Sequence, residues 1–316
     1  MDTAIAMLPT VLLYSSHNRC DYLHREFIID RALRGLRGDR TILHLPVSVK
    51  SQRGQRFDYG RFRWYYMHFR GRGLRYYPFY WNEHLRNQDL DIFFKMLHGS
   101  QVVVLGGGSS FLGMMRYRAM GMRYCGDGDL FRKVLIARQE RGALTVGFSA
   151  GADQLGEYLS GIISHSALDA CGIGLARDIV TAVHFSQARR RQIQRLARGL
   201  PHCLAFGLPN DSGIAISQGF LPSGSFWQTL LFIIDCSWEA PADLHHIKTR
   251  QGEKIHHFYS DGRHWAYNGG DMLVRVISKD YRWQKLLLVT NESRFIDYHS
   301  QKPSPLQSIQ EFLAGL

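Results

Sequence analysis

Short apolar runs that end in small residues recur along the chain, and two of them carry the most information. The first is Val102–Leu105, followed by Gly106-Gly-Gly108, and the second is Leu144–Phe148, followed by Ser149-Ala-Gly151. A short apolar run before a turn of small residues is typical of a buried strand that ends in a tight bend. The pattern therefore predicts two central strands with functional loops after them.

The same alternation of apolar runs and amphipathic segments extends over most of the chain. Strands alternating with helices form a mainly parallel sheet flanked by helices, so the pattern predicts an α/β fold. We expect strands at 10–14, 41–47, 101–105, 144–148, 179–185, 204–208, 213–217 and 230–234. We expect helices at 22–36, 90–97, 130–139, 150–159 and 186–199.

Two segments depart from this alternation. Residues 48–81 are rich in Arg, Gly and Tyr, and the alternation around Phe62-Arg-Trp64-Tyr-Tyr66 predicts an antiparallel hairpin or a long aromatic loop. After Trp238 the chain becomes polar and rich in His before two further strands and a terminal helix. We therefore predict an α/β domain at 1–238, with an insertion at about 48–81, and a C-terminal extension or small subdomain at 239–316.

The charge balance favours an anionic partner. The chain has 39 Lys and Arg against 27 Asp and Glu, a formal net charge of +12, and much of the excess is Arg in the insertion and in Arg189-Arg-Arg191. Such a charge attracts anions. Arginines interleaved with aromatic residues occur in single-strand binding proteins, but no nucleic-acid-binding signature accompanies them here. We therefore do not expect nucleic acid as the partner.

Cysteine usage and hydropathy bear on location. The five cysteines are scattered without a C-x-x-C pair, which is typical of reduced thiols in the cytosol. The first residues lack a basic leader, and no stretch approaches the roughly 18 apolar residues of a membrane span. We expect a cytoplasmic protein that has no membrane association.

The histidines after residue 238 raise the question of a metal site. They are His245-His246, His256-His257 and His264. Adjacent residues of a strand point to opposite faces, which works against a shared site for either pair. We therefore expect no metal.

The turn after the second central strand offers a nucleophile. Gly147-Phe-Ser149-Ala-Gly151 is a G-x-S-x-G pattern, in which flanking glycines let a strand bend sharply into a helix and expose a serine hydroxyl. The alternative is a serine that only caps the helix. A nucleophilic serine needs a base. His184 ends the strand at 179–185 and is the candidate, because sites form at the carboxyl edge of such sheets; alternatively it is a packing residue.

Several motifs, taken in order, resemble those of the S51 serine peptidases, the family of peptidase E and cyanophycinase. The resemblance covers about residues 10–234 and leaves out the part after Trp238. It implies a fold like that of class I glutamine amidotransferases, with flavodoxin-like layering, a Ser–His pair and no cofactor. The motifs are Gly106-Gly-Gly108-Ser-Ser-Phe, Val146-Gly-Phe-Ser149-Ala-Gly-Ala, Gly172-Ile-Gly-Leu175, Val183-His184-Phe185 and Phe206-Gly-Leu-Pro-Asn210.

The resemblance assigns roles to individual residues. It implies that Ser149 is the nucleophile, that His184 is the general base, and that the backbone N–H groups of Gly108 and Ala150 form an oxyanion hole. The implied reaction is hydrolysis of an amide through an acyl-enzyme.

The orienting residue departs from the family. The family carries Glu at the position of Asn210, and Asp211 is the adjacent acid. A shift of one residue in an extended segment points a side chain to the opposite face. Asn can also hold an imidazole tautomer, as in Cys-His-Asn proteases. Asn210 and Asp211 therefore both stand as candidates for orienting His184.

The implied substrate is an Asp-containing peptide or small amide with an anionic group, including isoaspartyl or β-linked forms. Arg189 and Arg191 would bind its carboxylate, although Arg191 also suits a solvated helix face. Ser109 is a further candidate for substrate binding. One alternative is a Ser–His acyltransferase or amidase of a specialised pathway. Another is a non-catalytic binding or regulatory protein of the same fold. The Arg/Tyr-rich insertion either covers the site or makes a subunit contact in a homodimer.

Overall fold

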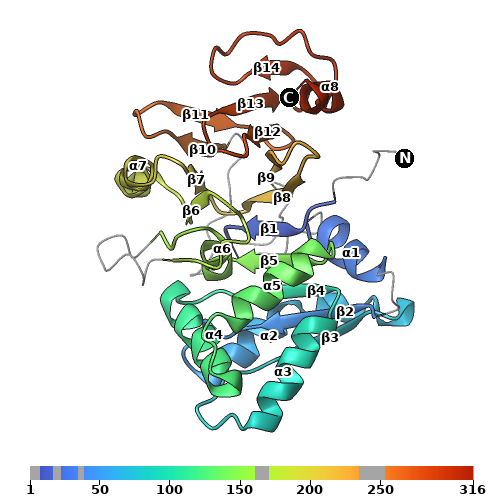
Figure 1. Ribbon diagram of the computed structural model, residues 1–316. Helices are drawn as coiled ribbons and strands as arrows, with labels where there is room; N and C mark the ends of the chain where they lie inside the picture. The colour runs from blue at the N-terminus through green and yellow to red at the C-terminus, as the bar shows by residue number, and fades with distance from the viewer. Residues whose placement is uncertain (1–7, 17–22, 35–38, 161–170, 235–252, 316) are drawn as a thin grey trace.

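A ten-stranded mixed sheet forms the centre of the protein (Figure 1). The computed structural model describes residues 8–16, 23–34, 39–160, 171–234 and 253–315. One half of the sheet is parallel, in the order β1-β5-β4-β2-β3. Its strands are β1 (Val11–Tyr14), β2 (Thr41–Leu45), β3 (Arg75–Pro78), β4 (Val102–Leu105) and β5 (Leu144–Phe148).

The other half of this sheet is antiparallel and begins where β8 pairs with β1. It contains β8 (Ser212–Phe220), β9 (Phe226–Ile234), β12 (Met272–Ile277), β13 (Gln284–Val289) and β14 (Phe295–Asp297). A second sheet has four strands in the order β11-β10-β7-β6. They are β6 (Ile179–Val183), β7 (Leu204–Leu208), β10 (Ile255–Phe258) and β11 (His264–Tyr267).

Helices cover both faces of the parallel half because alternate strand residues point to opposite sides. On one face Leu13 and Val103 belong to the same core as Phe93 of α3, and on the other Leu12 belongs to a core with Phe62 of α2. The first face is covered by α3 (Asn87–Gly99), α4 (Ser110–Cys125) and α5 (Leu130–Glu140). The second is covered by the π-helical turn η1 (Leu23–Ile29), α1 (Asp30–Leu33) and α2 (Gln52–Met67).

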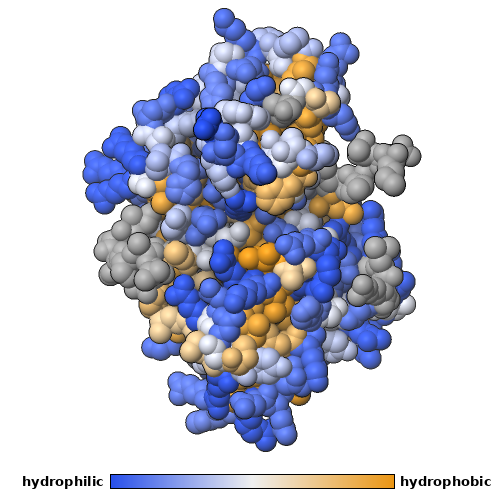
Figure 2. Space-filling model, in the orientation of Figure 1, coloured by the Kyte–Doolittle hydropathy of each residue, from blue (hydrophilic) through white to orange (hydrophobic). Residues whose placement is uncertain are grey.

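Shorter helices follow the strands that carry the candidate site. Helix α6 (Ala150–Leu155) follows β5, and α7 (Arg190–Gly199), preceded by the 3-10 turn η3 (Gln187–Arg189), packs on the outer face of the second sheet. The α/β fold with a largely parallel core is confirmed. Hydrophilic residues cover most of the face shown in Figure 2, with hydrophobic ones reaching the surface near its centre. Within the described ranges, no helix is long and apolar enough to cross a membrane.

The expected hairpin or loop in the Arg/Tyr-rich insertion is wrong. The segment forms helix α2, then the 3-10 turn η2 (Arg70–Arg72), then β3, which is a parallel edge strand. The residues that α2 buries are Gln55, Asp58, Phe62 and Tyr66, spaced three or four apart. This helical spacing places them on one face, so the short alternation around Trp64 was misleading.

The part after residue 252 extends both sheets. Strands β12–β14 continue the large sheet beyond β9, and β10 pairs with β7 of the second sheet. The last helix, α8 (Ile309–Ala314), packs Phe312 against Val274 and Leu287. The predicted boundary after residue 238 lies outside the described residues.

Candidate active site

The turn between β5 and α6 places Ser149 in a strained backbone conformation. Its φ is 52° and its ψ −111°, a region that side-chain-bearing residues rarely occupy. The flanking glycines are required by space, since a Cβ on Gly147 would lie 2.4 Å from the Gly151 carbonyl carbon. A Cβ on Gly151 would lie 2.2 Å from the Leu105 carbonyl oxygen. The turn therefore has the geometry of a nucleophile elbow.

The structure brings Ser149 and His184 together. The Ser149 Oγ lies 2.7 Å from the His184 Nε2, although the two residues are 35 positions apart. His184 directly follows β6 and has a φ of 53°, in the left-handed region. A hydroxyl within hydrogen-bond reach of an imidazole nitrogen is the arrangement in which a base takes the serine proton.

Ser15, which the sequence did not single out, holds the backbone of His184. The His184 N–H donates to Ser15 Oγ at 2.7 Å, and Ser15 Oγ donates to the Leu208 carbonyl at 2.8 Å. Ser15 thereby ties the end of β1 to the residue that follows β6 and to the last residue of β7. Its position directly after an apolar strand was the only available signal.

Asn210 contacts the other side of the imidazole. The Asn210 Oδ1 lies 2.6 Å from His184 Nδ1. An amide oxygen only accepts, so this contact puts a proton on Nδ1 and leaves the Nε2 lone pair facing Ser149. Ser149, His184 and Asn210 thus form a continuous chain of contacts from a hydroxyl through an imidazole to an amide acceptor.

Asp211, the adjacent acid, is buried and bonded elsewhere. The Asp211 Oδ1 accepts a hydrogen bond from Ser16 Oγ at 3.0 Å. The Asp211 backbone N–H donates to Ser16 Oγ at 3.2 Å. Asp211 has a φ of 58°, in the left-handed region, so its backbone departs from the conformation of a regular strand. The carboxylate therefore fastens the loop after β7 to the loop after β1.

The glycine loop after β4 packs closely on the residues that follow β2. Gly108 has a φ of 125°, and a Cβ there would lie 2.4 Å from the Ser48 carbonyl oxygen. The Ser109 N–H donates to that oxygen at 3.0 Å. The Ser109 hydroxyl accepts a hydrogen bond from the Leu112 N–H at 3.3 Å and thereby caps helix α4. This contact gives the predicted substrate-binding serine a structural role in the loop.

The predicted oxyanion donors follow neighbouring strands. Gly108 comes after β4 and the buried Ala150 comes after β5, and these strands pair in parallel. Their backbone N–H groups therefore belong to the same carboxyl edge as Ser149.

Asp153, on the helix after Ser149, was also missed. Its backbone N–H donates to the Ser149 carbonyl at 3.1 Å, and its Oδ1 accepts from the Ser160 N–H at 2.8 Å. Burial raises the pKa of the Asp153 carboxyl, against the opposing hydrogen bonds of Ser110 and Ser160. The side chain thereby links helix α6 to the first residue of α4 and to the residues that follow α6.

The two predicted substrate arginines differ in placement. Arg189 donates through Nη1 to the Val183 carbonyl at 2.8 Å, which anchors its exposed side chain beside His184. Arg191 is exposed on α7, whose buried residues are Ile193, Leu196 and Ala197. Only Arg189 therefore has a contact that ties it to the site.

The histidines that the structure describes after residue 252 make hydrogen-bond contacts with other side chains. His256 Nδ1 lies 2.8 Å from His264 Nε2, and burial lowers the pKa of His256 to about 4. His257 Nδ1 contacts the Tyr298 hydroxyl. In the described residues, no group of three or more His, Cys, Asp or Glu is placed to hold a metal ion. His245 and His246 lie outside those residues.

Comparison with known proteins adds information on the fold. The sequence matches no protein-family model and no curated protein. The structure is similar to the crystal structure of a peptidase from an acI-B1 Actinobacterium, with a TM-score of 0.56 and 12% sequence identity. The similarity covers 84% of this chain and 96% of that chain. The chain therefore shares the fold of that protein.

Proposed function

We propose that this protein is a serine hydrolase of the S51 type that cleaves the amide bond of an Asp-containing peptide. The observation that carries the proposal is the 2.7 Å contact between Ser149 Oγ and His184 Nε2 at a strained elbow. A serine that only capped α6 would use its hydroxyl on the helix, whereas Ser149 makes no side-chain hydrogen bond of that kind. The resemblance to S51 peptidases, with glutamine amidotransferase-like layering, forms part of the proposal.

The chemistry would proceed through an acyl-enzyme. Ser149 Oγ attacks the substrate carbonyl carbon while His184 Nε2 takes the hydroxyl proton. The N–H groups of Gly108 and Ala150 stabilise the oxyanion, and one such donor typically contributes about 2.7–4 kcal/mol. The imidazolium then gives its proton to the leaving amine as the C–N bond breaks. Water, activated by the same imidazole, hydrolyses the ester and returns Ser149.

The proposed substrate class is inferred from the positive charge of Arg189. Arg189 lies beside His184 and can bind a carboxylate through two parallel hydrogen bonds, which is the usual geometry for this pair. An aspartyl peptide, with either an α or a β linkage, supplies such a carboxylate close to the scissile amide.

The test is covalent labelling with a fluorophosphonate, followed by peptide mapping. We expect labelling at Ser149 in the wild type and none in Ser149→Ala, and a large fall in rate in His184→Ala. Replacement of the exposed Ser300 by Ala is the matched control and should leave labelling unchanged. Absence of labelling in the folded wild type would favour a non-catalytic binding protein.

Product masses identify the acceptor. Incubation with α- and β-linked aspartyl dipeptides, with and without added amines, should give only hydrolysis products. Products that contain the added amine would instead indicate an acyltransferase.

A further inference from the structure

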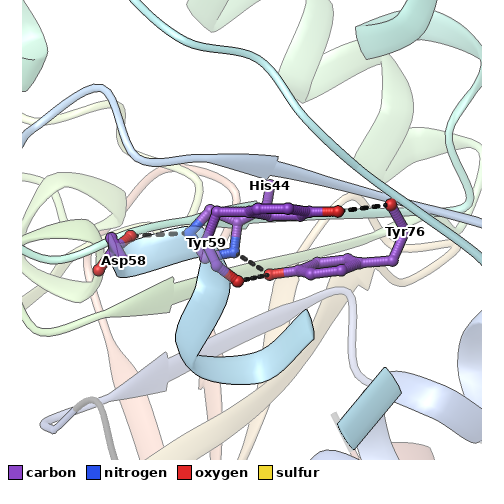
Figure 3. A network of polar contacts seen from close by, with 4 residues as sticks. All are labelled: His44, Asp58, Tyr59 and Tyr76. Carbon is purple, nitrogen blue, oxygen red and sulfur yellow. Dashed lines mark hydrogen bonds and ion pairs between the residues drawn. The ribbon is translucent and has the colours of Figure 1, made fainter. Parts of the chain in front are cut away.

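A second network of polar side chains lies against Gly106 of the glycine loop, and Figure 3 shows its four residues. It joins His44 of β2, Asp58 and Tyr59 of α2, and Tyr76 of β3. His44 Nε2 lies 2.8 Å from Asp58 Oδ2, and His44 Nδ1 lies 2.6 Å from the Tyr76 hydroxyl. His44, Asp58 and Tyr76 are all buried.

The direction of the hydrogen bonds follows from the groups present. Burial raises the pKa of the Tyr76 hydroxyl well above its ordinary value, so this group keeps its proton. A carboxylate only accepts, so His44 Nε2–H donates to Asp58, while the Tyr76 hydroxyl contacts Nδ1 on the other side of the ring. The Tyr59 hydroxyl donates to the Tyr76 backbone carbonyl at 3.1 Å, and the Tyr59 ring stacks on the Tyr76 ring. These two contacts hold Tyr76 in place at its end of the network.

The carboxylate end of this network supports Gly106. A Cβ on Gly106 would lie 2.3 Å from Asp58 Oδ2 and 3.2 Å from His44 Nε2, so the backbone rests on the point where the two side chains meet. The Gly106 N–H also donates to the Leu45 carbonyl at 3.0 Å. This end of the loop is therefore held by the side chains of His44 and Asp58 and by the backbone of Leu45.

A contribution to the stability of the fold does not by itself explain the buried His44–Asp58 pair. Burying a carboxylate and an imidazole costs free energy of desolvation, and apolar residues of similar volume often serve as well or better. Asp58 is also the one acidic residue in a helix with four arginines, and it points inward rather than to solvent. The burial of the Asp58 carboxylate is explained better by its contact with the backbone of Gly106.

We propose that Asp58 and His44 are positioning residues for the oxyanion hole, acting through Gly106 on the backbone N–H of Gly108. This inference rests on the proposed function, because it presupposes that the glycine loop stabilises a transition state. A displacement of about 1 Å in a catalytic group can lower a rate about 100-fold. The side chains of Asp58 and His44 need not touch the substrate for this effect.

The experiment measures the rate constant of fluorophosphonate labelling in the full chain. In this reaction Ser149 Oγ forms a bond to phosphorus, the P–F bond breaks, fluoride leaves with the electron pair, and the serine proton passes to His184. The final extent of labelling counts the folded molecules, whereas the rate constant reports the geometry of the site. A merely structural role would lower the extent and leave the rate constant of the folded molecules unchanged.

Three variants separate the explanations. Asp58→Ala should lower the rate constant 10-fold or more, whereas Asp58→Asn, which keeps the volume and an acceptor for His44, should stay within about 3-fold of the wild type. Asp271→Ala is the control, because Asp271 is also buried but accepts from the N–H groups of Asn268 and Asn291 near β12. It should leave the rate constant unchanged.

The outcomes distinguish this inference from the function on which it rests. If the wild type is labelled at Ser149 and folded Asp58→Ala is labelled at the same rate, the positioning role is wrong. An equal fall in Asp271→Ala, or in Asp58→Asn, would also overturn it. If the wild type is not labelled at all, the proposed function itself fails. The midpoint of the pH–rate profile should be the same in Asp58→Ala and the wild type, because His184 remains the base.

Discussion

His184 Nδ1 lies 2.6 Å from the amide oxygen of Asn210, so the imidazole is oriented by a neutral group. An amide oxygen selects the tautomer that a general base needs, but it carries no charge to stabilise the imidazolium that the proposed attack by Ser149 would form. In a Ser-His-Asp triad one carboxylate supplies both the orienting contact and the stabilising charge, whereas Asn210 supplies only the orienting contact.

Asn210→Asp should therefore raise the labelling rate at neutral pH, by about 10-fold, because hydrogen bonds to an ionised partner are roughly twice as strong. The carboxylate favours protonated His184, whereas the reaction needs the neutral base, so the acidic limb of the pH–rate profile should move to higher pH. The measurement is the phosphonate labelling rate from pH 5 to 9. Asn291→Asp, at an exposed site, is the control; a profile unchanged from the wild type in Asn210→Asp would contradict the assigned role.

Ser15→Ala should slow the reaction through His184 without touching the substrate. The change leaves the His184 N–H and the Leu208 carbonyl without the hydroxyl that joins them, at a histidine whose φ is already positive. We expect a loss of about 10- to 100-fold in the labelling rate. The free energy of unfolding should fall by about 1–3 kcal/mol.

Ser100→Ala is the matched control for Ser15→Ala. Ser100 is also buried and donates to a backbone carbonyl, that of Met96, at the end of α3. It should lose stability without any change in rate constant. Equal rate constants in the two variants would show that Ser15 serves stability alone.

The need for glycine at the elbow predicts opposite effects at two positions. At Gly151 a methyl group would meet the Leu105 carbonyl, whereas at Gly60, inside helix α2, no atom lies within 4 Å of the added carbon. Gly60→Ala should stabilise the protein by about 0.5–1 kcal/mol, since it removes a helix-interior glycine. Gly151→Ala should destabilise it by about 1–3 kcal/mol and slow labelling. Urea unfolding measures both, and similar values would contradict the packing shown here.

The local pattern of apolar and polar residues was sufficient to predict many of the strands and helices. The strands predicted at 101–105 and 179–185 are β4 (Val102–Leu105) and the slightly shorter β6 (Ile179–Val183), and the helix predicted at 130–139 is α5. The predicted helix after Ser149 is shorter than expected and ends at Leu155. Such elements are recognisable because one short stretch of chain contains the whole signal.

Long-range pairing was not visible in the same way. The continuation of the large sheet by β12–β14 depends on contacts with β9 that no local pattern encodes. Helix α2 was missed because Arg and aromatic residues alternate over a few positions, although its buried residues have helical spacing. In the candidate site, ordered motifs pointed to Ser149 and His184, which the structure places in contact. Ser15 and Asp58 act through backbone and loop contacts, and a single serine or aspartate gives no sign of these.

The buried histidine of β10 predicts how stability depends on pH. His257 is buried against the Tyr298 hydroxyl, and burial lowers the pKa of its imidazole to about 3, against an ordinary value of 6.5. A histidine whose pKa is lower in the folded state binds its proton more readily when unfolded. Its contribution to stability is therefore complete above about pH 6.5 and is lost as the pH falls towards 3.

The free energy of unfolding should thus fall between pH 6.5 and pH 4, with His257 contributing up to about 1.4 kcal/mol per pH unit. His257→Gln removes the titrating group, so its urea-derived stability should be lower than that of the wild type at pH 7 but should change less on acidification. The exposed His202 provides the control, and His202→Gln should retain the acid sensitivity of the wild type. An equally steep loss of stability in His257→Gln and the wild type would show that other groups cause the acid sensitivity.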